Sequence, residues 1–349
     1  MKKIVIQTLA TACMLLVANA ALAAEDTSSR GIKFDGSYTL QYREENGVGL
    51  DSHNFKNTFL LNFNSDIAPR VNVFGRYSYQ ANSQGEEWWS DYVSYGGPGG
   101  AYNGDEYNGA IDQYGVTYRG KDYTVTAGKV SFMLGGQGLL YDDTFYIGKH
   151  NVPKSLIITA KTGKTDWKAI AAQTSYQLGN SNDKIFALQG NHAINDYFSM
   201  GAVVAAAKYS AGNLGYSPAA DHDKTYYAVN GAYKVNDRLN WGAEFAKSNA
   251  DSLNKAYNIA ANYQMDAKNS LWASWWRVEQ NAAINNANWG SMTGFWADAH
   301  GTSIVWSHKM NKDLSMNIGN HNFKYMGNSG PTKGTDYRNS FRTVVSVKF

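Results

Sequence analysis

The sequence predicts an all-β fold: a closed 16-stranded antiparallel transmembrane β-barrel with short turns at one end and long loops at the other. Three observations predict it. Segments of about ten residues alternate apolar and polar side chains along the chain. The connectors between these segments fall into a short and a long class. The chain is rich in aromatics, with 24 Tyr, 14 Phe and 10 Trp, but after residue 23 it has no apolar run of about 18 residues that could form a spanning helix.

The segment that ends the chain shows the alternation most clearly. From Tyr337 to Phe349, apolar or aromatic side chains occupy most alternate positions, while Arg338, Arg342 and Lys348 lie on the other face. A strand with one apolar and one cationic face suits the closing seam of a membrane barrel. Its terminal aromatic, Phe349, resembles the signal by which outer-membrane barrels are recognised for insertion.

The same alternation recurs along the chain, for example in residues 34–42 and 55–63. The total is even, as single-chain bacterial barrels require. We expect sixteen strands, at residues 32–43, 54–64, 70–80, 110–119, 122–131, 153–162, 165–175, 183–192, 196–209, 224–234, 238–248, 254–264, 269–278, 297–308, 313–324 and 336–349.

The connectors alternate in length along this series. Seven are short and contain the Asn, Asp and Gly typical of tight hairpins. Eight are longer, and the longest are about 81–109, 132–152 and 279–296. This arrangement puts both termini at the short-turn end, which is the periplasmic end in bacterial barrels, and the long loops outside the cell.

The beginning of the chain is typical of an export signal. A basic start is followed by a mostly apolar stretch at 4–17 and by Ala21-Leu22-Ala23, a cleavage pattern. We therefore expect residues 1–23 to be a signal peptide and residues 24–349 to form a single barrel domain in the bacterial outer membrane. The only cysteine, Cys13, lies in the signal peptide, so the mature chain has no thiol for a disulfide or a thiolate metal site.

The charge balance of the mature chain argues against a nucleic-acid partner. Removal of the signal peptide lowers Lys and Arg from 32 to 30, against 29 Asp and Glu. This balance gives no basic domain for a nucleic acid. We also expect no cofactor, no metal and no enzymatic activity.

A barrel of about sixteen strands is wide enough to keep a water-filled channel. Strand parity gives the expected channel lining a polar character, and it gives the outer face a ring of mostly aromatic residues beside the short turns. The expected inward set is Arg43, Lys56, Thr58, Asn62, Arg76, Gln113, Thr117, Asn230, Glu244, Arg338 and Arg342. The expected ring is Tyr118, Tyr123, Trp167, Tyr197, Tyr233, Trp241, Tyr263, Leu314 and Phe349.

In this layout the chain resembles the general diffusion porins of Gram-negative outer membranes. The resemblance is strongest at Thr126-Ala127-Gly128-Lys129, just before a long third loop at about 132–152. It implies that this loop folds into the barrel and that its acidic residues, Asp142 and Asp143, face a basic wall. The residues expected in that wall are Arg43, Lys56, Arg76, Lys129, Arg338 and Arg342. Strict parity from Tyr123 places Lys129 on the lipid side, so a bulge or an early strand end is needed to turn it inward.

The resemblance also implies passive diffusion of ions and small hydrophilic solutes. It further implies a homotrimer embedded in outer-membrane lipid and lipopolysaccharide. The loop at about 81–109 is long enough to reach a neighbouring subunit.

Two other classes of function, a substrate-specific channel and an enzymatic barrel, compete with passive diffusion. A substrate-specific channel for sugars, oligopeptides or organic acids would line its path with aromatics. Trp272 and Trp276 share one strand face, either as such a track or as part of a lipid-facing girdle. An enzymatic barrel would need a nucleophile beside a histidine. His300 and His308 are too far apart to act together, and His222 lies in a charged loop.

Overall fold

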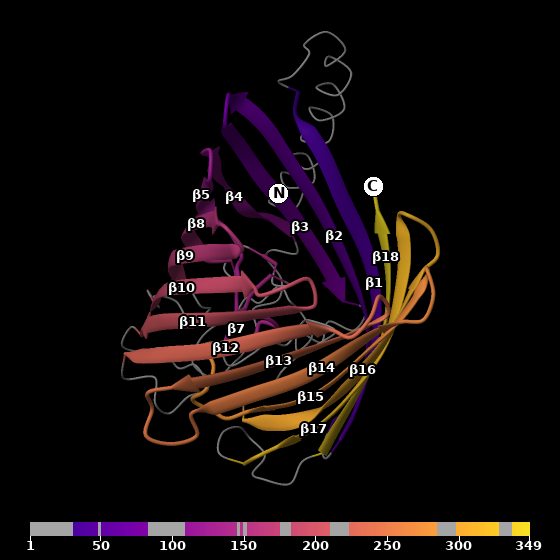
Figure 1. Cartoon of the computed structure of the whole chain (residues 1–349). Coiled ribbons are helices and arrows are strands. Elements are labelled where there is room, and N and C mark those ends of the chain that lie inside the picture. The colour runs from indigo at the N-terminus through magenta and orange to yellow at the C-terminus, as the bar shows by residue number, and fades with distance from the viewer. Residues whose placement is uncertain are drawn as a thin grey trace.

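The computed structural model describes residues 31–47, 50–82, 109–144, 147–148, 152–174, 183–209, 223–284, 298–327 and 337–349. Within these ranges sixteen strands form one closed barrel, and two short strands pair as a separate hairpin (Figure 1). All neighbouring strands pair antiparallel, and the first pairs with the last to close the barrel. The predicted fold class is therefore confirmed. Within the described ranges no helix is long and apolar enough to cross a membrane.

The strands follow one another around the barrel in chain order, except that β6 and β7 lie apart from it. Their bounds are β1 (Lys33–Gly47), β2 (Leu50–Ala68), β3 (Val71–Asn82), β4 (Gly109–Arg119), β5 (Tyr123–Lys129), β6 (Met133–Leu134), β7 (Tyr141–Asp142), β8 (Lys154–Thr162), β9 (Thr165–Thr174), β10 (Asp183–Ala193), β11 (Phe198–Lys208), β12 (Lys224–Lys234), β13 (Leu239–Ser248), β14 (Lys255–Gln264), β15 (Asn269–Val278), β16 (Ala299–Lys309), β17 (Leu314–Tyr325) and β18 (Tyr337–Lys348).

Each of the sixteen expected strands has a counterpart in the barrel, and two differences stand out. The first expected loop, residues 44–53, is largely strand, because β1 and β2 stay paired from Glu44 opposite His53 to Gly47 opposite Leu50. The hairpin β6–β7 was not expected, because two-residue strands leave no alternation to detect.

The closing seam joins β1 to β18 from Ser37 opposite Lys348 to Gly47 opposite Arg338. The terminal residue extends it, since the Gly36 amide donates to the Phe349 carbonyl at 2.9 Å. The Phe349 ring stacks on Phe59 on the outer face, with centroids 5.9 Å apart. A barrel closed in this way has no edge strand left to pair with another chain.

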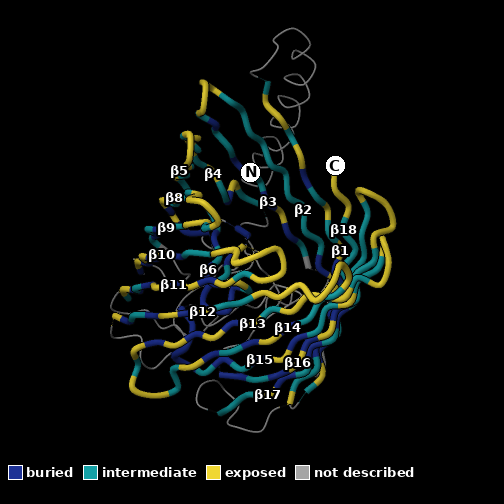
Figure 2. Tube along the Cα trace, viewed as in Figure 1, coloured by how far each residue is buried: buried dark blue, intermediate teal, exposed yellow. Residues whose placement is uncertain are grey.

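The outer face of the barrel is apolar. In β10, Lys184, Phe186 and Leu188 are exposed while the residues between them are buried, so alternate side chains point outward and inward. Figure 2 shows this alternation of exposed and buried positions along the strands. Eight members of the predicted aromatic ring are exposed: Tyr118, Tyr123, Trp167, Tyr197, Tyr233, Trp241, Tyr263 and Phe349.

The interior wall is of two kinds. Along β18, β1, β2 and β3 its buried positions are polar or charged, as expected. From β9 to β17 many inward positions are small or apolar and belong to one buried cluster inside the barrel. The wall residues of this cluster are Ile170, Ala172, Ile185, Ala187, Val203, Ala205, Ala207, Tyr226, Ala228, Ala246, Ala256, Trp276, Val278, Ala299 and Phe323.

Candidate functional site

The described part of the loop between β5 and β8, residues 130–144, 147–148 and 152–153, is folded into the barrel, and we call it the inner loop. The β6–β7 hairpin lies within it and is drawn inside the ring of strands (Figures 1 and 2). Phe132 and Tyr141 stack with ring centroids 4.6 Å apart. Leu134, Leu139 and Leu140 are fully buried against the apolar wall. Burial of each leucine contributes about 1.5–3 kcal/mol, so hydrophobic packing holds the loop against one side of the interior.

The inward residues of β11 to β15 form three rows that cross the strands, because each residue is the register partner of the next. We name them by position. The anchor row is Gly201, Asn230, Glu244, Asn258 and Trp276; the hollow row is Ser199, Ala232, Gly242, Ala260 and Ser274; the rim row, nearest the short turns, is Lys234, Asn240, Asn262 and Trp272.

The tip of the inner loop is fixed to the anchor row through Glu244. The Glu244 carboxylate is 3% exposed and accepts a hydrogen bond from the Gln137 backbone amide at 2.7 Å. The backbone amides of Gly136 and Leu139 also face this carboxylate and favour its charged form. Consecutive amides turned toward one anion form a concave site of the kind that favours negative charge. Positive φ angles at Gly135 and Gly138, 95° and 73°, allow the chain to make this turn.

Side chains on neighbouring strands add further attachments to the loop. Asn258 donates from Nδ2 to the Gln137 Oε1 at 2.7 Å, and Lys168 donates from Nζ to the Met133 carbonyl at 3.3 Å. The Gly135 amide donates to Gln189 Oε1 at 3.3 Å. Together with Glu244 of β13, these contacts come from four strands, β9, β10, β13 and β14, so the loop is held at one level of the barrel.

Asp143 braces the base of the inner loop. Its carboxylate is fully buried and accepts from the Phe132 amide at 2.6 Å and from the Tyr141 hydroxyl at 3.1 Å. Burial raises the pKa of Asp143 well above its usual range. Asp142 accepts from the Thr144 amide and hydroxyl at 2.9 and 2.6 Å, which closes a local turn.

A second segment covers the inner loop from the long-loop end. Residues 281–284, just after β15, are buried, and the Ile284 amide donates to the Leu140 carbonyl at 2.9 Å. Lys224 holds this segment through a 3.1 Å bond to Asn281 Oδ1. No sequence pattern indicates this contact, because it joins backbone groups of two loops.

Five residues of the predicted basic wall lie on four adjacent strands, β18, β1, β2 and β3, and we call these five the basic arc: Arg338, Arg342, Arg43, Lys56 and Arg76. The sixth, Lys129, ends β5. Arg342 and Arg43 are direct register partners, with exposures of 1% and 6%. Arg43 forms an ion pair with Glu45, and Arg342 donates to Ser340 Oγ at 3.1 Å. Lys56 is the register partner of Gln41 and is also buried.

Arg338 lies near the long-loop end of the arc. It faces Gly47 across the seam, and its guanidinium carbon lies 5.2 Å from the centroid of the Tyr325 ring. That distance is typical of a cation–π contact.

Arg76 forms the best-defined ion pair of the arc. Its Nε lies 2.8 Å from Asp112 Oδ1 and its Nη2 lies 2.8 Å from Asp112 Oδ2. The side chain of Asp112 is fully buried. The register skips Asp112 between Gln113 and Ile111, so a β-bulge places it as an extra residue beside Arg76. Asp112 also accepts from the Gly148 amide at 2.9 Å. Asp112 therefore links Arg76 of the basic arc to Gly148 of the inner loop.

Lys129 does not follow the parity that put it on the lipid side. It is 7% exposed, although Tyr123 and Ala127 of the same strand are exposed outward. Gly128 before it has φ 150°, an irregular conformation that breaks the alternation at the strand end. An irregularity of this kind is what the sequence analysis requires for Lys129 to turn away from the lipid side.

The structure thus brings most of the predicted basic residues onto adjacent strands, but gives two of them acidic partners that the sequence did not identify. These partners are Glu45 and Asp112. The predicted acids Asp142 and Asp143 make their hydrogen bonds within the inner loop itself. Glu244, which parity placed on the channel wall, anchors the loop instead of lining open space.

Trp272 and Trp276 face the interior, so the girdle interpretation of this pair is wrong. Trp276 is fully buried beside Phe323, with ring centroids 6.3 Å apart, and its Nε1 donates to Ser303 Oγ at 3.4 Å. Trp272 lines a cavity that also touches Gln137 of the inner loop. On the same strand, Trp275 is 45% exposed on the outer face.

Other predicted residues lie apart from this site. His308 bonds Asn269 Oδ1 at 2.8 Å near a short turn. Among the described residues no three His, Cys, Asp or Glu side chains gather as metal ligands. The signal peptide, His222 and most of the loop at about 81–109 lie outside the described residues.

A barrel of sixteen antiparallel strands with the loop after its fifth strand folded inside is a porin fold. No protein-family model matches the sequence, and no curated protein matches it. Solved structures of the porin of Rhodopseudomonas blastica do match in fold. One variant has a TM-score of 0.56 at 12% identity and another 0.55 at 11%, each covering 91% of this chain and 100% of the porin. A structure described as concerning asymmetric conductivity of engineered proteins gives 0.55 at 12% with the same coverage. At these identities the similarity establishes the fold.

Proposed function

We propose that this protein is an outer-membrane porin that lets ions and small hydrophilic solutes diffuse passively through its barrel. The observation that carries the proposal is the combination of an apolar outer face with an inner loop folded inside a closed barrel. An apolar exterior suits lipid, where a closed barrel satisfies every backbone hydrogen bond. A loop inside the barrel narrows the interior and sets a size limit.

The solute path in this proposal runs between the inner loop and the basic arc. The opposite side is filled by hydrophobic packing around Leu134, Leu139 and Leu140. Arg43, Lys56, Arg76, Lys129, Arg338 and Arg342 would supply positive charge along one side of the path. The acidic residues Asp142 and Asp143 of the inner loop would lie on the other side. The buried acids Glu45 and Asp112 offset part of that charge. We therefore expect a moderate preference for anions, weakened by high salt.

Location and assembly are part of the same proposal. Residues 1–23 would direct export and Phe349 would serve as the insertion signal. The solved structures of similar fold are porins, and we propose the homotrimer usual for such proteins, surrounded by outer-membrane lipid and lipopolysaccharide.

Planar-bilayer recording of the refolded protein tests the channel. Stepwise conductance with a reversal potential on the anion side is expected; a protein that folds but gives no steps would refute the proposal. Neutral substitutions at Arg76, Arg338 and Arg342 should move the reversal potential toward cations. Arg119→Gln is the matched control, because Arg119 is 55% exposed beside a short turn and pairs with Asp66.

A substrate-specific channel is the second candidate, and one observation favours it: Trp272 and Trp276 face the interior. Liposome swelling across a series of neutral sugars separates the two. A smooth fall in rate with solute mass indicates diffusion, whereas one sugar that departs from the curve indicates a binding site.

A further inference from the structure

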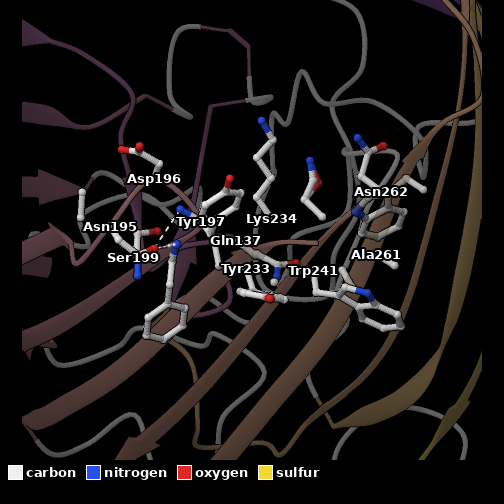
Figure 3. A pocket seen from close by; sticks show the side chains of 17 residues that line it. Gln137, Asn195, Asp196, Tyr197, Ser199, Tyr233, Lys234, Trp241, Ala261 and Asn262 are labelled. Atoms are coloured by element: carbon white, nitrogen blue, oxygen red, sulfur yellow. Dashed lines mark hydrogen bonds between the residues drawn. The ribbon is translucent and has the colours of Figure 1, made fainter. Parts of the chain in front are cut away.

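A cavity of about 740 Å³ lies inside the barrel at its short-turn end, below the tip of the inner loop (Figure 3). Its lining combines the rim row and Gln137 with Ser199, Ala232, Gly242 and Ala260 of the hollow row. Residues 193 and 195–198 at a short turn, together with Tyr233, Trp241 and Ala261, complete the lining. A volume of this size is within the range of small-molecule sites, about 300–1,000 Å³. The cavity is separate from the basic arc, which lies on β18 and β1 to β3.

The hollow exists because its wall has almost no side chains. Ala232, Gly242 and Ala260 are consecutive register partners on three strands, so none of them fills the space in front of the sheet. At Gly242 the Nε2 of Gln137 lies 2.6 Å from the position that a Cβ would take. Larger residues at these positions would have closed the hollow and displaced the tip of the loop.

The rim row offers the amides of Asn240 and Asn262 and the indole of Trp272. Asn240 is the register partner of Asn262, and Asn262 is the register partner of Trp272. Gln137 extends from the loop on the facing side, where its Oε1 is taken by Asn258 and its Nε2 is turned toward the hollow. Each amide group carries both donors and an acceptor, which matches hydroxyl groups that donate and accept at once.

The charges around the hollow balance one another. Lys234 of the rim row forms an ion pair with Asp237 at 2.7 Å, and the lining also includes the acidic Asp196. Glu244, one row above, is covered by the amides of the loop tip and is 3% exposed. An organic acid or a cation would find no concentrated opposite charge here.

We propose that this hollow is a binding subsite for a neutral carbohydrate within the solute path, an inference that rests on the proposed channel function. The indole of Trp272 packs against the apolar C–H face of a sugar ring. Asn240, Asn262 and the Gln137 amide exchange hydrogen bonds with its hydroxyls. The site slows and orients the sugar at the short-turn end without closing the path along the basic arc.

Isothermal calorimetry of the refolded protein with maltose tests the subsite without relying on conductance. Saturable binding is expected, and Trp272→Leu should weaken it by roughly tenfold or more. Trp275→Leu is the matched control, because this tryptophan is on the outer face of the same strand. Asn262→Leu supplies a second lining variant if Trp272→Leu does not fold. Absence of saturable heat in the folded wild type, or equal affinity in the lining variants and the control, would overturn the subsite.

Bilayer recording with maltose separates failure of the subsite from failure of the channel. Transient current blocks that disappear in Trp272→Leu are expected. Normal steps with no effect of maltose would overturn the subsite and leave the channel intact. A folded protein that binds maltose in the calorimeter but gives no steps would overturn the channel and the placement of the sugar within a solute path.

Discussion

Substitution of Glu244 by Ala removes the acceptor that holds the tip of the inner loop. The Glu244 carboxylate accepts a hydrogen bond from the Gln137 amide at 2.7 Å, and the amides of Gly136 and Leu139 face it. A hydrogen bond to a charged group contributes about 1.5–3 kcal/mol, and a buried amide left without an acceptor costs about 1–3 kcal/mol. The carboxylate's own desolvation offsets part of this sum. We therefore expect docking of the tip to weaken by about 2 kcal/mol, which is roughly a 30-fold change in the docking equilibrium.

Amide hydrogen exchange read by mass spectrometry measures this change directly. In E244A, exchange of peptides spanning residues 135–139 should accelerate by roughly 30-fold, and single-channel current should become noisier as the tip moves. The apolar contacts of Leu134 and Leu140 remain, so the barrel should stay folded. Asp237→Asn, at an exposed short turn, is the control. Unchanged exchange at the tip in a folded E244A protein would refute the assignment of Glu244 as its anchor.

Three further predictions concern other parts of the barrel. Arg76→Ala leaves Asp112 buried and unpaired, so the free energy of unfolding in denaturant should fall by about 3–5 kcal/mol, and a loss no larger than that of Arg119→Ala would contradict this. Because burial raises the pKa of Asp143, its contribution to stability should be full below about pH 4 and should be lost as pH rises through its folded pKa. Melting followed against pH should show that decline in the wild type, and Asp143→Asn should remove it. Deletion of Phe349 removes the backbone bonds to Gly36 and should slow assembly into lipid vesicles, measured by heat-modifiable migration on gels; an unchanged rate would count against the insertion role.

The strands were predictable because the pleat forces side chains to alternate, and in β10 burial alternates residue by residue from Asp183 to Gln189. Alternation could not show which face of a strand points inward where both faces of the strand are apolar. From Gly201 to Ala207 every residue of β11 is small or apolar, so the inward wall of the cluster left no periodic signal. In β15 tryptophan occurs on both faces, so only the register with β14 distinguishes Trp275 from Trp272.

Contacts of the inner loop were harder to predict for a different reason. Its tip is held by backbone amides around Glu244, and backbone groups are the same at every position of a sequence. The bulge at Asp112 likewise depends on one extra residue between paired positions, which shifts local parity without a distinctive residue type. Parity predicted an inner face for Arg43, Arg76 and Arg342, but it gave no indication of Glu45 and Asp112, the acidic partners of Arg43 and Arg76.

The apolar inner wall has a consequence for how the protein reaches its final form. From β9 to β17 the barrel is apolar on its inner as well as its outer surface. Without a cover, that inner surface would bind lipid tails, detergent or unfolded chains as readily as the outer surface does. Leu134, Leu139 and Leu140 cover that inner surface, so the inner loop shields the apolar wall of the barrel from such contacts. Shortening the inner loop to enlarge the opening would therefore expose the apolar wall and favour aggregation and blockage of the barrel, unless the wall residues were made polar in the same variant.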